Sequence, residues 1–153
     1  MNSQRNYDDR GPHHSQNNPS SQVKPRLSSY ANEQGDLRPE VVDSEARSEA
    51  DLWVQSKISY SQIRKFFGAV RGDERRFALT DPSDAEAQVA MMMLKTKAHY
   101  AAAREGKHKP IADFFTHHAQ LVKTPSDFGF FLRHFEAAVA YHKFLEKDQK
   151  NVR

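Results

Sequence analysis

The sequence predicts an all-α protein, a compact bundle of four main helices behind a polar N-terminal tail. Apolar residues recur at helical spacing in four stretches between residues 60 and 147. Each stretch opens on a residue pattern typical of a helix N-terminus. No stretch alternates apolar and polar residues as a half-buried strand does, so strands are not expected.

The predicted tail covers residues 1–43. This part is rich in Ser, Asn, Gln and Pro, and none of the ten Phe lies in the first third of the chain. It lacks the apolar surface whose burial offsets the entropy of ordering, so we expect it to be disordered. We interpret the adjacent His13 and His14 as an incidental pair rather than a metal site. The helical bundle domain is expected over residues 44–153.

A short extra helix is possible at the start of the domain, over Ser44–Gln55. Its one weakly apolar side carries Ala46, Ala50 and Trp53. Trp53 is the single tryptophan, and we expect it to dock on the core.

The first main helix is expected over Tyr60–Arg71. Ser59 and Gln62 form a capping box at its start, and Gly72 can end it. Its apolar residues recur at the i, i+3, i+4, i+7 spacing of one buried face. They are Ile63, Phe66, Phe67 and Val70.

The second main helix runs from a capping box of Ser83 and Glu86 to about Arg104, before Gly106. It is apolar on two opposite sides. One side consists of Val89, Met92, Met93, Thr96, Tyr100 and Ala103, and the other of Met91, Leu94, Ala98, Ala101 and Ala102. A helix that is apolar nearly all round is typical of the centre of a bundle.

Two further helices are expected, Pro110–Val122 and a last one that opens at Thr124 and runs to about Lys147. The last helix has a second apolar stripe opposite its core face. This stripe consists of Phe130, Ala137, Tyr141 and Phe144. Its aromatic residues are predicted to form a subunit interface, because an exposed aromatic stripe usually marks one. The alternative is that the Ser44–Gln55 helix covers them.

The two parts of the chain differ in charge. Residues 1–52 carry six Lys/Arg and nine Asp/Glu, whereas residues 53–153 carry seventeen and eleven. The helical part is thus more basic than the whole-chain net charge of +3 indicates. This favours a polyanionic partner, although many ordinary domains are equally basic.

Cationic side chains border the apolar faces of the first and second main helices. No acidic residue lies between Glu86 and Glu105 to neutralise those of the second helix. Arg can donate two parallel hydrogen bonds to a phosphate, and Lys acts as a point charge. The alternative is that these residues are only the solvated rim of a core. The cationic residues in question, candidates for contact with a phosphate backbone, are Arg64, Lys65, Lys95, Lys97 and Arg104.

The sequence contains no recognisable catalytic or metal-binding pattern. It has no cysteine, nucleophile elbow, phosphate-binding glycine loop or H-E-x-x-H motif. His117 and His118 point about 100° apart on a helix, so they cannot share one ion. His118 and His142 are interpreted as core-edge residues with a hydrogen-bond partner. We therefore expect no enzymatic activity, no metal and no cofactor.

Targeting signals are also missing from the sequence. No apolar run approaches the roughly 18 residues that a membrane span needs. The N-terminus has no charged-then-apolar signal pattern. We expect a soluble cytoplasmic protein with no membrane partner.

Three motifs occur in a fixed order along the helical part. They are S-x-I-R-K-F at Ser61–Phe66, L-K-x-K-x-x-Y-x-x-x-R at Leu94–Arg104, and F-E-A-x-x-A-Y-H-K at Phe135–Lys143. In these motifs and their order, the chain resembles the small-subunit family of type III-A CRISPR–Cas effector complexes, the Csm complexes. The resemblance covers roughly residues 56–147. Each motif alone is weak, but the three together on an all-α chain are fairly specific.

The resemblance implies a compact helical subunit without enzymatic activity of its own. Several copies would stack beside the subunits that hold the guide RNA and contact the target RNA path through its sugar–phosphate backbone. The implied partners are guide and target RNA, other subunits of the type III-A complex, and like copies of the chain. The five cationic residues named above are then the RNA-facing candidates.

Two other functions compete with this interpretation. A helical protein–protein adaptor without a nucleic-acid role would depend on the aromatic stripe and not on the cationic edges. A DNA-binding regulator is disfavoured, because a second main helix that is apolar on both sides could not enter a groove.

Overall fold

The computed structural model describes residues 26–152 of the 153-residue chain, and these residues form five α-helices. In chain order, with η for a short 3-10 helix, the elements are η1 (Pro39–Val42), α1 (Ser44–Gln55), α2 (Tyr60–Leu79), α3 (Asp84–Arg104), η2 (Gly106–His108), α4 (Lys109–Leu121) and α5 (Pro125–Asn151). Within these residues the only β-type pairing is an isolated bridge between Ala31 and Leu37. The all-α prediction is confirmed, including the short extra helix α1. None of the described helices is long and apolar enough to cross a membrane.

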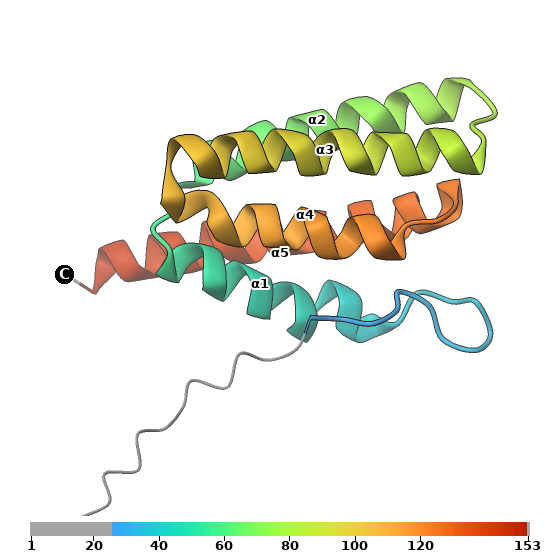
Figure 1. The fold of residues 1–153 in the computed structure, drawn as a ribbon. Helices are drawn as coiled ribbons and strands as arrows, with labels where there is room; N and C mark the ends of the chain where they lie inside the picture. The colour runs from blue at the N-terminus through green and yellow to red at the C-terminus, as the bar shows by residue number, and fades with distance from the viewer. Residues whose placement is uncertain (1–25, 153) are drawn as a thin grey trace, which may run out of the picture.

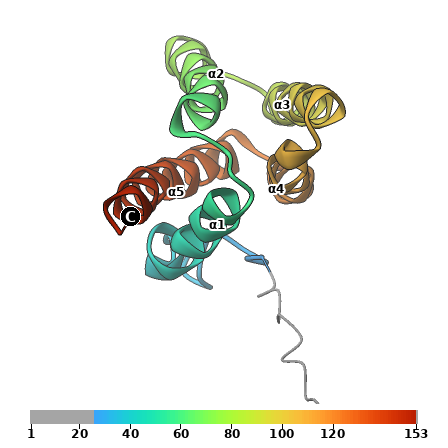
Figure 2. The same ribbon diagram turned by 90° about the vertical axis from the view of Figure 1, so that its left-hand side faces the viewer.

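The helices stack in three layers (Figure 1; Figure 2). α2 and α3 form an antiparallel hairpin in one outer layer, α4 and α5 lie in the middle, and α1 lies on the other side of α5. α5 packs against both α1 and α2, whereas α3 packs mainly against α4. The central element of the fold is therefore α5.

Capping boxes start three of the helices. In α2, α3 and α5, the N-cap side chain accepts a hydrogen bond from the backbone N–H of the third helical residue. The side chain of that third residue accepts a hydrogen bond from the backbone N–H of the N-cap residue. The three boxes are Ser59–Gln62, Ser83–Glu86 and Thr124–Asp127. The starts predicted for these helices are confirmed.

α2 is longer than the sequence predicts, because it continues to Leu79 instead of ending at Arg71. Gly72 is exposed in the middle of the helix, where glycine costs about 1 kcal/mol relative to alanine. Two i,i+3 ion pairs support the additional turns. The Phe77 ring also packs edge-to-face on Phe128, with ring centroids 5.2 Å apart. These contacts offset the cost of the glycine.

The core is aromatic and lies between α1, α4 and α5. Trp53 of α1 is fully buried, with its ring edge-to-face to Phe114 at 5.2 Å and to Phe135 at 5.9 Å between centroids. The expectation that Trp53 docks on the core is confirmed. Aromatic rings in this geometry add about 0.5–1.5 kcal/mol per pair beyond the area they bury.

Residues 26–43, which we call the strap, pack against the bundle. The expectation of a disordered tail up to residue 43 does not hold for this part. The buried residues of the strap are Leu27, Tyr30 and Val41. Residues 1–25, which include the pair His13 and His14, lie outside the described part of the chain.

Side chains from the middle layer hold the strap through its backbone. The Nε2 atom of His117 donates to the carbonyl of Leu27 at 2.5 Å, and the Nδ1 atom of His134 donates to the carbonyl of Val41 at 2.6 Å. These bonds join residues about ninety positions apart in the sequence. Composition cannot reveal such partners, so a polar segment that has them is expected to be disordered.

Candidate nucleic-acid interface

α3 lies at the edge of the bundle with one face buried and the opposite face exposed. The buried residues, on the side of α4, are Ala87, Ala90, Met91, Leu94 and Ala98. On the opposite face Val89 is 59% exposed, Met92 46%, Met93 65% and Tyr100 66%. We call these four residues the α3 apolar face. The prediction that both sides of this helix are buried is wrong, because the fold places no described element over the second one.

The cations predicted on α3 flank this apolar face. Lys97 and Arg104 are exposed and Lys95 is half-buried. None of the three forms an ion pair with another residue in the described part of the chain. The guanidinium of Arg104 lies over the ring of Tyr100, 5.9 Å from its centroid. The charge of these side chains is therefore available to an anionic partner.

The hairpin brings cations of two helices to one end of the outer layer (Figure 1). Because α2 and α3 are antiparallel, Arg64 and Lys65 near the start of α2 lie level with the second half of α3. Both are exposed, and neither forms an ion pair within residues 26–152. Arg71, on the same edge as Arg64, pairs with Glu74 at 2.9 Å. All five predicted RNA-binding residues thus lie on one hairpin and keep uncompensated charge.

The aromatic stripe predicted as a subunit interface is only partly exposed. Phe130 and Tyr141 are half-buried, whereas Phe144 is 60% exposed. The hydroxyl of Tyr141 donates to Asp43, and the guanidinium of Arg47 lies 5.9 Å from the centre of its ring. The start of α1 thus covers one part of the stripe and leaves Phe144 open.

Buried histidines in this fold act as hydrogen-bonding residues. The Nε2 atom of His142 donates to the carbonyl of Ile58 at 2.8 Å, and the Nδ1 atom of His118 bonds the hydroxyl of Tyr30 at 2.6 Å. The prediction that His118 and His142 have hydrogen-bond partners is confirmed, but both side chains are fully buried and do not lie at the edge of the core. Burial lowers the pKa of both rings. Among residues 26–152, no three His, Cys, Asp or Glu side chains lie where they could hold a metal ion.

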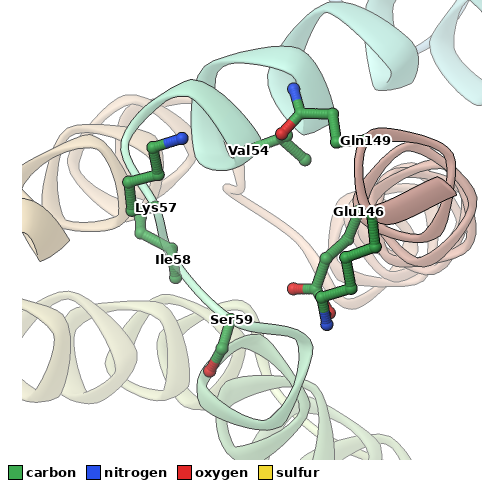
Figure 3. A pocket seen from close by; sticks show the side chains of 7 residues that line it. Val54, Lys57, Ile58, Ser59, Glu146 and Gln149 are labelled. Atoms are coloured by element: carbon green, nitrogen blue, oxygen red, sulfur yellow. The ribbon is translucent and has the colours of Figure 1, made fainter. Parts of the chain in front are cut away.

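A pocket of about 280 Å³ lies between the α1–α2 connection and the end of α5 (Figure 3). It is lined by Val54, Lys57, Ile58, Ser59, Glu146, Gln149 and Lys150. The carboxylate of Glu146 accepts from the backbone N–H of Tyr60 at 2.9 Å and from Lys150 at 3.2 Å. This carboxylate therefore fastens α5 to the start of α2.

Sequence reasoning missed the exposure of the α3 apolar face. The cations of α3 lie on the two edges that separate its apolar faces, so each face has the same cationic borders. The pattern of charge therefore does not indicate which face is buried. The number of helices available to cover α3 decides this, and that number is a property of the tertiary structure.

The fold and the site define a small helical module that presents cationic helix edges and one open apolar face. A family model described as Csm2 type III-A matches residues 36–148, which is most of the chain. The chain therefore belongs to the Csm2 family, the small subunit of type III-A CRISPR effector complexes. Csm2 is a non-catalytic structural subunit. No curated protein and no solved structure matches the chain.

Proposed function

We propose that this subunit binds the sugar–phosphate backbone along the guide and target RNA path of the type III-A complex, and that it stacks with like copies. One observation carries the RNA-binding part. The five predicted cations on the α2–α3 hairpin all lack an acidic partner among the described residues. Each such cation can neutralise one phosphate and release its counterion.

Binding without sequence preference suits this role. Base pairing between guide and target reads the sequence, so the protein needs only shape and charge. Phosphate contacts position a protein and carry no direct sequence information. A subunit that serves any guide benefits from contacts of this kind.

The proposed stacking uses the aromatic stripe of α5. Its residues are Phe130, Tyr141 and Phe144. The exposure of Phe144 supports this contact, while Tyr141 is engaged by α1 and contributes a smaller open surface. Identical copies joined through unlike surfaces form an open stack when the rotation between neighbouring copies does not close into a ring.

Salt-dependent binding of a long single-stranded RNA tests the RNA-binding part. The wild type is compared with a variant in which Lys95, Lys97 and Arg104 are changed to Ala. The logarithm of the binding constant falls with the logarithm of salt concentration by about 0.7 for each phosphate contact in a single strand. We expect the triple variant to bind more weakly and with a slope smaller by about 2.

The matched control removes three cations that already have acidic partners. Lys107, Lys109 and Lys150 form ion pairs at 3.4, 3.0 and 3.2 Å, respectively, and their replacement by Ala changes the net charge equally. We expect this control to keep most of the wild-type slope. Equal behaviour of the two triple variants would refute a specific RNA surface on α3.

A protein–protein adaptor is the second candidate, and the α3 apolar face favours it. An exposed row of large apolar side chains usually marks a contact with another protein. This function gains support if the α3 cations have no effect on RNA binding while a substitution at Met93 prevents incorporation into the complex.

A further inference from the structure

The strongest unexplained feature of the molecule is the α3 apolar face. Val89, Met92, Met93 and Tyr100 lie on the solvent side of one helix. From Val89 to Tyr100 the helix rises about 17 Å, at 1.5 Å per residue. Scattered single apolar residues on a surface are normal, but a continuous row of this length marks an interaction site.

Charge argues against a symmetric contact between two α3 apolar faces. Lys95, Lys97 and Arg104 flank the face without an acidic partner among the described residues. Two such faces packed on each other would bring like charges together, which is costly at an interface. The face fits a surface with exposed apolar side chains that are bordered by acids.

The opposite side of the same molecule has a surface of this kind, although it also carries one cation, Arg47, whose guanidinium lies 5.9 Å from the centre of the Tyr141 ring. Val42 is 37% exposed and lies between two exposed acids on the strap, Glu40 and Asp43. The hydroxyl of Tyr141 donates to Asp43, and Phe144 follows one turn later on α5. We call Val42, Tyr141 and Phe144, with these acids, the strap-side face.

The overall distribution of charge agrees with this pairing. Residues 26–58 carry four Lys/Arg and seven Asp/Glu, whereas residues 60–104, which form the α2–α3 hairpin, carry eight and five. The first group forms the layer of α1 and the strap, and the second forms the layer on the far side of α4 and α5 (Figure 1; Figure 2). The molecule therefore has oppositely charged sides.

We propose that the α3 apolar face of one copy packs against the strap-side face of the next copy. This inference rests on the stacking part of the proposed function and names the surface that meets the stripe of α5. A contact between unlike surfaces on opposite sides of one molecule repeats in one direction. Lys97 and Arg104 lie at the rim of such a contact, where they can also reach an RNA backbone that follows the stack.

Substitutions on the two faces test this contact. Met93→Glu and Phe144→Glu each place a charge at an exposed position, so neither is expected to disturb the fold. We expect each variant alone to weaken self-association at least tenfold in sedimentation velocity. Mixed together, the two variants are expected to form a dimer and no larger species, because each keeps one intact face. Val152→Glu, at another highly exposed apolar position, is the control and is expected to associate like the wild type.

Cross-linking identifies the occupant of the α3 apolar face directly. The chain has no cysteine, so Met93→Cys carries a single photoreactive benzophenone label. Both the free protein and the guide-containing complex purified through a tag on this chain are irradiated. We expect cross-links to residues near Val42 and Phe144 of a second copy. Cross-links between two α3 helices, to RNA, or only to other subunits would overturn the inference.

Failure of this inference can be told apart from failure of the proposed function. Met93→Glu removes no cation, so we expect it to keep most of the salt slope for RNA binding. Unchanged association of Met93→Glu together with weakened association of Phe144→Glu would leave stacking intact and reject the α3 apolar face as its counterpart. Loss of RNA binding in the α3 triple variant is measured independently.

Discussion

Single histidines join segments of this protein that are far apart in the sequence. His117 and His134 donate to carbonyls of the strap, and His142 donates to the carbonyl of Ile58 in the α1–α2 connection. Burial lowers the pKa of His134 to about 4, although its hydrogen bond to Val41 acts in the opposite direction. Burial also lowers the pKa of His142. The rings of His134 and His142 therefore remain neutral in the folded state when the same residues in an unfolded chain are already charged.

Acid is expected to destabilise the fold through these rings. A histidine with a lowered pKa binds fewer protons when folded than when unfolded. Its contribution to the free energy of unfolding is therefore complete at pH values above the unfolded pKa of about 6.5. Stability then falls as the pH drops from about 6.5 towards the folded pKa of His134, by up to about 1.4 kcal/mol per pH unit for each such ring. Urea unfolding at a series of pH values measures this slope.

Variants assign the slope to individual residues. His134→Gln can still donate to Val41 but does not titrate, so we expect a flatter pH dependence of the unfolding free energy. His99→Gln, at an exposed position on α3, should keep the wild-type slope. An unchanged slope in His134→Gln would show that other groups dominate the acid response.

At the scale of elements, α2 shows how tertiary contacts override a local stop signal. Gly72 is an effective helix terminator only if the chain beyond it gains nothing by remaining helical. Here Phe77 packs on Phe128 of α5, and Asp73 pairs with Arg76 at 3.0 Å. The helix therefore passes through the glycine and carries the hairpin to Leu79.

Gly72→Ala is expected to stabilise the protein by about 1 kcal/mol. The position is helical and exposed, and a Cβ atom there meets no atom within 4 Å. Chemical denaturation compares it with Gly35→Ala, where the space is equally open but φ is +85°. We expect Gly35→Ala to destabilise, because an L side chain disfavours that conformation. Similar effects of the two substitutions would contradict this explanation.

At the scale of the whole molecule, the strap is part of the folded domain. It contributes buried apolar residues to the core and backbone acceptors to the histidines of α4 and α5. Arg26 at its start pairs with Glu49 of α1, with 2.5 Å between Nε and Oε1. Glu49 is buried, and burial raises its pKa while Arg26 lowers it. Without this partner the carboxylate would be left uncompensated.

Truncation tests the position of the domain boundary. A chain that begins at residue 44 loses three buried side chains, worth about 1.5–3 kcal/mol each, and leaves polar groups unpaired. We expect a loss on the order of 5 kcal/mol, which is comparable to the entire stability of a small domain. A chain that begins at residue 26 keeps all of these contacts and is the reference. Equal thermal unfolding of the two chains would show that the strap does not stabilise the bundle.

Local interactions explain what could be predicted from the sequence. The starts of α2 and α3 follow from capping boxes whose members are three residues apart, and the start of α5 follows from Thr124 with Pro125 after it. The faces of α2 and α5 that enter the core follow from apolar spacing. The five candidate RNA-binding residues could be placed at solvent-accessible edges, because unpaired charges are rarely buried. Their role in RNA binding stays a prediction.

By itself, then, the sequence determined the helices, most of their ends, the aromatic core and the cationic edges, since each depends on residues within a few positions of one another. Only the tertiary structure decided which side of α3 is covered, how far α2 extends past Gly72, and that residues 26–43 belong to the domain. These features depend on contacts between residues far apart in the chain, such as His134 with Val41. A helix with two apolar sides can bury either one, and the neighbouring elements select which side remains free to bind a partner.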